Sequence, residues 1–431
     1  MRTLAEWLAL QESVHPKTID MGLARVASVA RTLRVDKPAC PVITVGGTNG
    51  KGSTVTHIEA FLRAGGLTTG MFTSPHFIRY NERICVDAVE VADAELISAF
   101  ERIERARGST TLTFFEYNAL AALLIFTDRG VGSMVLEVGL GGRLDATNLV
   151  DADVGVVCSI GFDHRDWLGD TLELIGAEKA GIFRSGRPAV LGTAAMPQSV
   201  FAAIDTVGAR PIVAGTDFRW HIDGQLWGYD GLRLRLRDLP PSALAGSIQY
   251  RNAATALAAV ESLGTTRLGD RFALDSRGVS RALGSVRLAG RFQVVPGSGT
   301  GGPGEWILDI AHNEPAAKIF AEHVKERPLP SASGRTFAVI GILGDKDARE
   351  IVSALMPVVD RWILCSLPGP RGVSAEQLAQ RLQLLPDTVT LAASVADGCE
   401  AASAAATSDD RVIVFGSVYT VGPALQWLRI Y

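Results

Sequence analysis

Short apolar runs rich in valine and isoleucine alternate with helix-like segments along most of the chain. The runs lack polar alternation, so each predicts a strand that is buried on both faces of a sheet. Strands of this kind, joined by helices, form mostly parallel sheets covered by helices. In the first part of the chain the runs are CPVITVGG (40–47), SMVLEVG (133–139), DVGVVCSIG (153–161) and RPAVLG (187–192). The sequence therefore predicts an α/β protein.

Two segments interrupt this alternation and divide the chain. Residues 216–238 alternate apolar and polar side chains around Asp-Gly turns, so we expect a small antiparallel unit there. Residues 288–306 contain a glycine-rich insert that we expect to be irregular. The strand–helix pattern then restarts, so we predict two domains, 1–287 and a smaller Rossmann-like α/β domain, 288–431. The runs of the second domain are WILDIA (306–311), TFAVIGIL (336–343), RWILCSL (361–367) and RVIVFGSV (411–418).

Composition excludes several classes of protein. The net charge of -4 provides no broad basic surface for nucleic acid or anionic membranes. The longest apolar stretches, such as 119–126, are too short to span a bilayer, and Glu6 and Glu12 do not suit a signal peptide. Five cysteines lie far apart without a CxxC pair, which predicts reduced thiols. We expect a cytoplasmic protein, active as a monomer, with no nucleic-acid or membrane partner.

The stretch ITVGGTNGKGSTVTHIEAFLRAGG (43–66) places a glycine-rich loop and a lysine between a predicted strand and a predicted helix. The usual phosphate loop has the pattern G-x-x-x-x-G-K-[ST]. Gly50 and Lys51 fit it, but Gly52 stands where a hydroxyl residue belongs, and Ser53 comes one position late. Glycines and a helix N-terminus still direct N–H groups at phosphates, and Lys51 adds a mobile positive charge. We predict a nucleotide-phosphate site in which the hydroxyl of Ser53 or Thr54 reaches Mg²⁺; the alternative is a turn without a ligand.

The loop GTNGKGS (47–53) resembles the ATP loop of the Mur ligase superfamily, whose members form amide bonds at the expense of ATP. Other segments, from about residue 4 to 430, resemble folylpolyglutamate synthases, most closely the bacterial form that is also a dihydrofolate synthase. The segments that carry this resemblance are MGLARV (21–26), TSPHFIRYNERI (73–84), LEVGLGGRLDATN (136–148), SIGFDHRDWLGDTLELIGAEKAGIFR (159–184), DIAHN (309–313) and PGPRGVSAEQLA (368–379).

The resemblance implies a carboxylate–amine ligase. ATP would phosphorylate a carboxylate to an acyl phosphate, and the amine of L-glutamate would displace the phosphate. The acceptors implied are dihydropteroate, which gives dihydrofolate, and the γ-carboxylate of folates such as tetrahydrofolate. Phosphoryl transfer depends mainly on positioning and charge neutralisation, so such a site needs cations and metal ligands.

Three residues at predicted strand ends have the chemistry of a metal site. Glu137 ends an apolar strand at its carboxyl end, where open α/β sheets place ligands. His164 follows another strand, and Ser74 lies in the loop after TTGMF. Oxygen donors with one imidazole suit Mg²⁺ or Mn²⁺. The resemblance implies that Ser74, Glu137 and His164 hold a Mg²⁺ between the nucleotide and the reacting carboxylate. Ser53 would bind a second Mg²⁺ at the phosphate loop. Whether a monovalent cation also binds is left open.

Lys179, in AEKAGIF, lies on a predicted helix. The resemblance implies that CO₂ carbamylates it, which would turn a cation into an anionic metal ligand. This requires an amine that can lose its proton at this position. The alternative is an ordinary lysine paired with a carboxylate.

The resemblance also assigns residues to ATP. Asp309 and His312 end a strand of the second domain and would contact ribose and phosphate, while Asn252 and Arg291 would contact adenine and phosphates. We expect Arg291 at the domain junction, where domain closure could deliver it. The loop residues assigned to ATP are Thr48, Asn49, Gly50, Lys51, Gly52, Ser53 and Thr54. The residues assigned to catalysis are Lys51, His164, Lys179, Arg291 and His312.

Four residues match positions that bind the folate or the incoming glutamate: Arg83, Asp145, Ser417 and Tyr419. An arginine and hydroxyls suit a substrate with two carboxylates. FGSVY (415–419) could instead be only a strand end and a helix cap. The chain also departs from the family pattern, with Ala24 where glutamate is frequent and Glu314 where proline commonly follows the asparagine.

Three alternatives stay open. A cell-wall ligase would need an additional UDP-binding domain, for which we expect no room before a loop at about residue 46. A folylpolyglutamate synthase without the dihydropteroate reaction is the second. The third is an ATP-hydrolysing regulator, which would have no use for Lys179, DIAHN or FGSVY.

Overall fold

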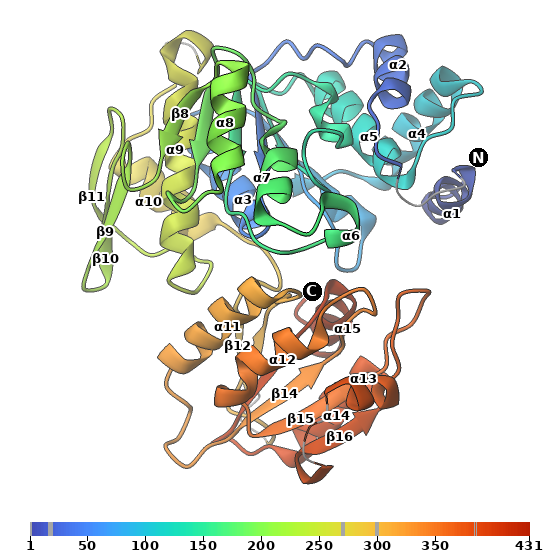
Figure 1. The fold of residues 1–431 in the computed structure, drawn as a ribbon, viewed down its shortest axis with the longest axis vertical. Helices are drawn as coiled ribbons and strands as arrows, with labels where there is room; N and C mark the ends of the chain where they lie inside the picture. Colours follow the sequence, from blue (N-terminus) through green and yellow to red (C-terminus); the bar gives the residue numbers. More distant parts are fainter. Residues whose placement is uncertain (1, 16–19, 269–271, 298–300, 383, 385) are drawn as a thin grey trace. The chain divides into compact units, whose positions relative to one another are not determined.

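The chain forms two compact units in the computed structural model, which describes residues 2–15, 20–268, 272–297, 301–382, 384 and 386–431 (Figure 1). The first unit comprises Met1–Ala243 and Gln249–Arg287, and the second comprises Leu244–Ile248 and Leu288–Tyr431. The backbone therefore passes from one unit to the other more than once. Each unit is built around its own central sheet.

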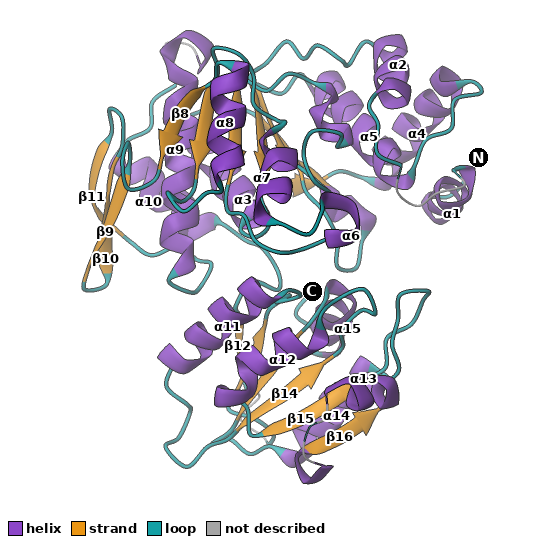
Figure 2. Ribbon diagram, viewed as in Figure 1, coloured by secondary structure: helices purple, strands orange, loops and turns teal. Residues whose placement is uncertain are grey.

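An eight-stranded sheet forms the centre of the first unit (Figure 2). Its strands are β1 (Val42–Gly46), β2 (Thr69–Phe72), β3 (Ile84–Val86), β4 (Val89–Glu90), β5 (Ser133–Glu137), β6 (Val154–Val157), β7 (Pro188–Leu191) and β8 (Arg210–Val213). Their order across the sheet is β4-β3-β2-β5-β1-β6-β7-β8; β3 pairs antiparallel with both β2 and β4, and all other neighbours pair parallel. Strand β1, which precedes the glycine-rich loop, thus lies between β5 and β6.

Helices flank this sheet. They are α1 (Leu4–Val14), α2 (Ala24–Leu33), α3 (Lys51–Ala64), α4 (Asp93–Arg107), α5 (Phe114–Arg129), α6 (Arg165–Leu168), α7 (Leu172–Ala180), α8 (Gln198–Val207), α9 (Ile248–Leu268) and α10 (Ser276–Ser285), with short 3₁₀ turns η1 (Tyr80–Arg83) and η2 (Ala146–Leu149). Helix α5 begins at a capping box in which Thr113 and Glu116 each bond the other's backbone N–H. This local signal explains where an apolar helix with little amphipathic pattern starts.

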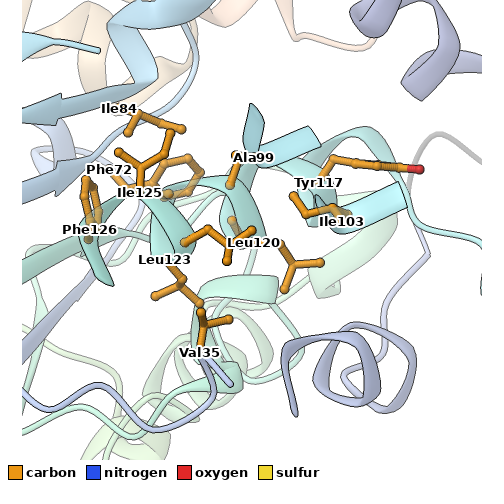
Figure 3. Close-up of a cluster of buried hydrophobic side chains, with 14 of the residues drawn as sticks. Val35, Phe72, Ile84, Ala99, Ile103, Tyr117, Leu120, Leu123, Ile125 and Phe126 are labelled. Atoms are coloured by element: carbon orange, nitrogen blue, oxygen red, sulfur yellow. The ribbon is translucent and has the colours of Figure 1, made fainter. Parts of the chain in front are cut away.

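The apolar side chains of α1, α2, α4 and α5 share one core with β2 and β5. Figure 3 shows part of it, with side chains contributed by β2 (Phe72), α4 (Ile103) and α5 (Leu120). Nearly all of α5 is buried there, since it packs on helices and on the sheet. This core supports the ends of β2 and β5, from which two of the predicted site residues project.

A three-stranded antiparallel sheet, in the order β11-β10-β9, confirms the small antiparallel unit predicted for residues 216–238. Its strands are β9 (Arg219–Asp223), β10 (Leu226–Asp230) and β11 (Arg235–Leu239). Glu261 on α9 anchors it, because its carboxylate accepts the Tyr229 hydroxyl and the backbone N–H groups of Leu232, Arg233 and Leu234.

The second unit contains a six-stranded sheet in the order β12-β13-β17-β14-β15-β16. Its strands are β12 (Gln293–Pro296), β13 (Glu305–Leu308), β14 (Thr336–Ile340), β15 (Arg361–Cys365), β16 (Val389–Ala392) and β17 (Arg411–Phe415). Its helices are α11 (Glu314–Glu326), α12 (Ala348–Leu355), α13 (Ala375–Leu382), α14 (Val395–Ala405) and α15 (Val418–Trp427), with 3₁₀ turns η3 (Met356–Val358) and η4 (Pro386–Thr388). All neighbouring strands are parallel except β12, which pairs antiparallel with β13.

The α/β class and the mostly parallel sheets are confirmed, but the expectation for residues 288–306 is wrong in part. Gln293–Pro296 forms a regular edge strand, since its backbone finds partners along β13. The sequence concealed this because glycines and proline surround a strand of only four residues. Residues 298–300 of the insert lie outside the described part of the chain.

No described helix combines the length and the apolar character needed to cross a bilayer. The five cysteines are free, and all but Cys40 are buried. Burial raises the pKa of the Cys158 thiol to about 11 and that of Cys85 to about 12. These thiols are therefore poor nucleophiles at neutral pH.

A buried ion pair joins the sheet of the second unit to the end of α11. Arg411, which is 1% exposed, donates from Nε to Glu305 Oε1 at 2.7 Å. Its remaining nitrogens donate to the carbonyl oxygens of Val324, Arg327 and Pro328. The guanidinium thus satisfies a buried carboxylate and the C-terminal carbonyls of the helix together.

We predict that Arg411→Met lowers the free energy of unfolding of the second unit by about 3–5 kcal/mol, because it leaves buried acceptors without a donor. Denaturant unfolding measures the change. Arg335→Met is the control, since this exposed guanidinium lies 3.7 Å from Asp410 and should contribute at most about 1 kcal/mol. Equal losses in the two variants would contradict the assignment.

Candidate active site

The glycine-rich loop connects the central strand β1 to α3 in a conformation that depends on glycine. Gly47 and Gly50 have φ angles of +137° and +88°, which residues with a Cβ atom rarely adopt. A Cβ atom on Gly50 would lie 3.0 Å from the side-chain oxygen of Asn252. The loop and Asn252 on α9, both assigned to ATP, therefore lie in contact.

The segment that follows β6 holds the loop. The Thr48 N–H donates to the Ser159 carbonyl (2.7 Å), and the Thr48 hydroxyl bonds both the N–H and the carbonyl of Gly161 (3.0 Å each). The Asn49 N–H donates to the Ser159 hydroxyl (3.2 Å), which donates in turn to the Asn49 carbonyl (3.0 Å). The N–H groups of Thr48 and Asn49 are thus engaged within the protein. The N–H groups at the first turn of α3 have no partner within the helix, so they are available as donors to a phosphate.

Two lysines meet at the Gly47 carbonyl oxygen. Lys51 Nζ donates to it at 3.0 Å and to the Thr48 carbonyl at 3.3 Å, and Lys179 Nζ donates to it at 3.2 Å. Lys179 lies near the end of α7 and is only 5% exposed. Burial and the neighbouring Lys51 charge lower the pKa of Lys179 to about 7, although Asp163 and Asp145 oppose the shift. A substantial fraction of the Lys179 amine is therefore uncharged near neutral pH.

Ser74 and Glu137 are brought together by the pairing of their strands. Strands β2 and β5 are parallel neighbours with Phe72 beside Leu136, so both residues follow at the same edge of the sheet. The Ser74 N–H donates to Glu137 Oε2 at 3.1 Å, and Glu137 is 3% exposed. A buried carboxylate at a strand end, next to a hydroxyl, has the donor chemistry of a Mg²⁺ or Mn²⁺ site.

His164 caps the short helix α6 in a left-handed conformation, with φ 51° and ψ 40°. Its N–H donates to Asp163 Oδ1 at 2.9 Å, and its Nε2 lies 3.8 Å from Asp163 Oδ2. The side chain is one-third exposed, so the ring is accessible to a ligand. Within the described residues, no cluster of three or more His, Cys, Asp or Glu side chains could hold a metal alone. A metal here would therefore also use hydroxyl, carbamate or phosphate oxygens, and the residues present fit that requirement.

Asp145 and Arg83 have different surroundings. Asp145 is buried, and its carboxylate accepts the N–H groups of Gly139, Leu140 and Thr147 and the Thr147 hydroxyl. Burial raises the pKa of Asp145 despite these bonds. Its carboxylate thus shapes the loop 139–147. Arg83 donates to His76 Nδ1 at 2.7 Å and lies over the rings of Tyr80 and Phe114.

The second unit carries the other assigned residues at the edge of its sheet where the parallel strands end and the antiparallel strand β12 begins. Asp309 and His312 follow β13, and Arg291 precedes β12. Ser417 follows β17 and is buried; its hydroxyl bonds the Gly341 carbonyl (3.3 Å) and the Thr420 hydroxyl (2.9 Å). Ser417 stands at the N-cap position of α15, but its side chain makes no capping hydrogen bond. Tyr419 is 48% exposed on that helix.

Sequence reasoning missed the residues that hold the loop. Ser159 and Gly161 lie inside a quoted motif, but nothing in their spacing showed that they bind the loop backbone.

Comparisons with known proteins agree with this geometry. Two family models match the chain: the Mur ligase middle domain over residues 45–196 and the Mur ligase glutamate ligase domain over residues 290–418. The dihydrofolate synthase/folylpolyglutamate synthase of Escherichia coli (strain K12) is 42% identical, over 98% of this chain and 95% of its own length. The chain belongs to the dihydrofolate synthase/folylpolyglutamate synthase family. The Haemophilus influenzae member is 38% identical, over 97% of this chain and 96% of its own length.

Solved structures of the dihydrofolate synthase/folylpolyglutamate synthase family match both units. E. coli FolC in complex with DHPP and ADP has a TM-score of 0.92 and 41% identity, over 100% of this chain and 98% of that chain. A bifunctional folylpolyglutamate synthase/dihydrofolate synthase with Mn, AMPPNP and L-glutamate bound has a TM-score of 0.89 and 38% identity, over the same shares. The predicted family and its ATP-dependent ligase class are confirmed.

We predict that Lys179→Met raises the free energy of unfolding below about pH 7 by a few kcal/mol, since each unit of pKa shift is worth about 1.4 kcal/mol. The unfolded lysine binds a proton up to its ordinary pKa of 10.5, whereas the folded one loses it from about 7. The stability of the unchanged protein therefore rises with pH between these values, and the advantage of the variant shrinks across that window.

Urea unfolding at pH 6, 8 and 10, in metal-free and bicarbonate-free buffer, measures this difference. Lys37→Met is the control, because Lys37 is an exposed lysine of the same unit. A Lys179→Met advantage that stays constant across the pH range would show that Lys179 has an ordinary pKa.

Proposed function

We propose that this protein adds L-glutamate to dihydropteroate and to the γ-carboxylate of folates, through an acyl phosphate formed from ATP. The observation that supports this most is the convergence of Lys51 and Lys179 on the Gly47 carbonyl, beside the first turn of α3. The Lys51 ammonium at a helix N-terminus suits a polyphosphate, and Lys179 beside it has the depressed pKa that a carbamate requires.

In this reaction Lys51 and the N–H groups at the start of α3 bind the phosphates and hold the γ-phosphoryl group in line with the acceptor carboxylate. Asn252, in contact with Gly50, would reach the adenine or the phosphates beside the loop. The acyl phosphate keeps the carboxylate electrophilic until the glutamate amine attacks it and inorganic phosphate leaves. Thr48 and Asn49 contribute by fixing the loop.

Ser74, Glu137 and His164 would hold a Mg²⁺ that neutralises phosphate charge, and Ser53 would serve a second Mg²⁺ at the phosphate loop. The neutral Lys179 amine would attack CO₂ and release a proton, which gives a carbamate with two oxygen donors. In that form Lys179 no longer repels Lys51 at the shared carbonyl. The two Mg²⁺ sites leave open whether a monovalent cation also binds.

The second unit would contribute Arg291, Asp309 and His312 to the nucleotide. The pterin or glutamate substrate would be bound by Ser417, Tyr419, Arg83 and Asp145. Asp145 would act through the loop that it shapes. Arg83, whose guanidinium lies over two aromatic rings, would bind a substrate carboxylate. We further propose that the protein works as a cytoplasmic monomer on small molecules alone, in keeping with its free buried thiols.

In the presence of Mg²⁺, we expect the release of phosphate from ATP to require both L-glutamate and a pterin substrate. The test supplies glutamate throughout and adds dihydropteroate, tetrahydrofolate or neither. Release with both pterins supports the bifunctional activity, and release with tetrahydrofolate alone would restrict it to polyglutamylation. Equal release with neither pterin would overturn the ligase proposal.

We predict that Lys51→Ala lowers kcat/KM for ATP by about 100-fold or more, because removing one positioned donor to transition-state charge has an effect of this size. Initial rates of phosphate release at varied ATP concentration measure it, and circular dichroism verifies the fold. Lys37→Ala, an exposed lysine of the same unit, should keep the rate. Near-normal turnover by folded Lys51→Ala would remove Lys51 from the phosphate site.

A further inference from the structure

The carboxylate of Asp309 binds two separate turns of the second unit. Its Oδ2 accepts the backbone N–H of Phe292 at 2.7 Å, and its Oδ1 accepts that of Ala311 at 2.9 Å. The first donor lies 17 residues before Asp309 and the second lies two residues after it. One side chain at the carboxyl end of β13 thus connects the turn that enters β12 with the turn that leads to α11.

Both donor residues have left-handed backbones although neither is glycine. The φ angle is 46° at Phe292 and 23° at Ala311. A residue with a Cβ atom loses about 1–2 kcal/mol in this region, so surrounding contacts must hold it there. The Asp309 carboxylate supplies such a contact at each of the two positions.

Each left-handed residue adjoins a residue that we assign to the nucleotide. Arg291 directly precedes Phe292, and His312 directly follows Ala311. The φ of Phe292 and Ala311 therefore decides the direction in which these neighbours leave the backbone. The Phe292 ring is also fixed, because it packs edge-on against His323 (5.2 Å between ring centroids) and Phe320 (5.9 Å).

A further backbone bond closes this arrangement. The Ile310 N–H donates to the Gly290 carbonyl at 3.1 Å, which holds the two turns side by side. Asn313 then caps α11 by accepting the Ala316 N–H at 3.0 Å, so the backbone is ordered on both sides of His312. The Asp309 carboxylate is the side chain that ties both turns into this frame.

We propose that Asp309 is a positioning residue, which orients Arg291 and His312 by holding Phe292 and Ala311 in left-handed conformations. This goes beyond a direct contact of Asp309 with ribose or phosphate, and it rests on the proposed function in that Arg291 and His312 must act on the nucleotide. The two roles differ in a testable way. Glycine adopts the left-handed conformation without help, so glycine at position 311 can replace part of a positioning role but none of a direct contact.

The test measures ADP affinity by calorimetry for the full-length protein and for Asp309→Asn, Ala311→Gly and the double variant. Asparagine retains one acceptor oxygen but places an amide NH₂ against the other N–H donor, so it breaks the double contact with little change in volume. Asp410→Asn is the matched control. Asp410 also accepts two backbone N–H groups, from Arg335 (2.7 Å) and Thr407 (2.8 Å), but it precedes β17 at the opposite edge of the same sheet, and neither donor is left-handed.

We expect Asp309→Asn to weaken ADP binding about tenfold, as loss of a charge-assisted hydrogen bond would. Ala311→Gly should recover about threefold of this loss in the Asp309→Asn background, and Asp410→Asn should bind ADP as the unchanged protein does. Thermal unfolding verifies that all variants are folded.

Equal ADP affinities of Asp309→Asn and the double variant would overturn the positioning role, as would an equal loss in Asp410→Asn. ADP binding does not depend on ligation, so this outcome is separate from a failure of the proposed function. That failure would appear in the unchanged protein as phosphate release that needs no pterin or glutamate.

Discussion

The Gly47 carbonyl oxygen, which accepts both Lys51 and Lys179, is the contact on which the site of the first unit depends. Burial makes a charge on Lys179 costly, and repulsion from the Lys51 ammonium at the same acceptor adds to this cost. The response is a depressed pKa, which makes the Lys179 amine available for chemistry near neutral pH. The same carbonyl belongs to a residue with φ +137°, so the electrostatics of the site rest on a backbone conformation that favours glycine.

The order of strands explains why these groups meet. Strand β1 lies between β5 and β6, so the glycine-rich loop has Glu137 on one side and the Ser159–Gly161 segment on the other. Strand β2, next to β5, adds Ser74 at the same edge. Parallel strands direct their carboxyl ends to one edge of the sheet. The four chain segments that leave this edge supply the lysine and carboxylate charges, the Ser74 hydroxyl, and the segment 159–161 that holds the glycine-rich loop.

The second unit uses the same principle with different groups. Asp309 follows β13 and Ser417 follows β17, its neighbour in the sheet, and both side chains bond backbone groups of adjacent turns. Their carboxylate and hydroxyl therefore shape the edge of the sheet whether or not they touch a substrate. Carboxylates have a similar structural use elsewhere in the protein, as Asp145 shapes a loop and Glu261 anchors a small sheet. A polar residue in a family motif can thus be needed for geometry as much as for contact.

The sequence by itself determined the α/β class, the small antiparallel unit, the glycine-rich loop between a strand and a helix, and the family, because these depend on local periodicity, turn residues and contiguous motifs. It failed at β12, where glycines hid four residues that become a strand only when β13 offers a partner. It named Lys51 and Lys179, yet it could not show that residues 128 positions apart share one acceptor at 3.0 and 3.2 Å. Nor could it show that Asp309 holds Phe292 and Ala311 in left-handed turns. Such contacts are decided by the tertiary structure. Strand order brings distant segments together, and burial changes the free energy of a charge or of a strained backbone angle. The sequence encodes the chemical groups, and the tertiary structure decides their surroundings.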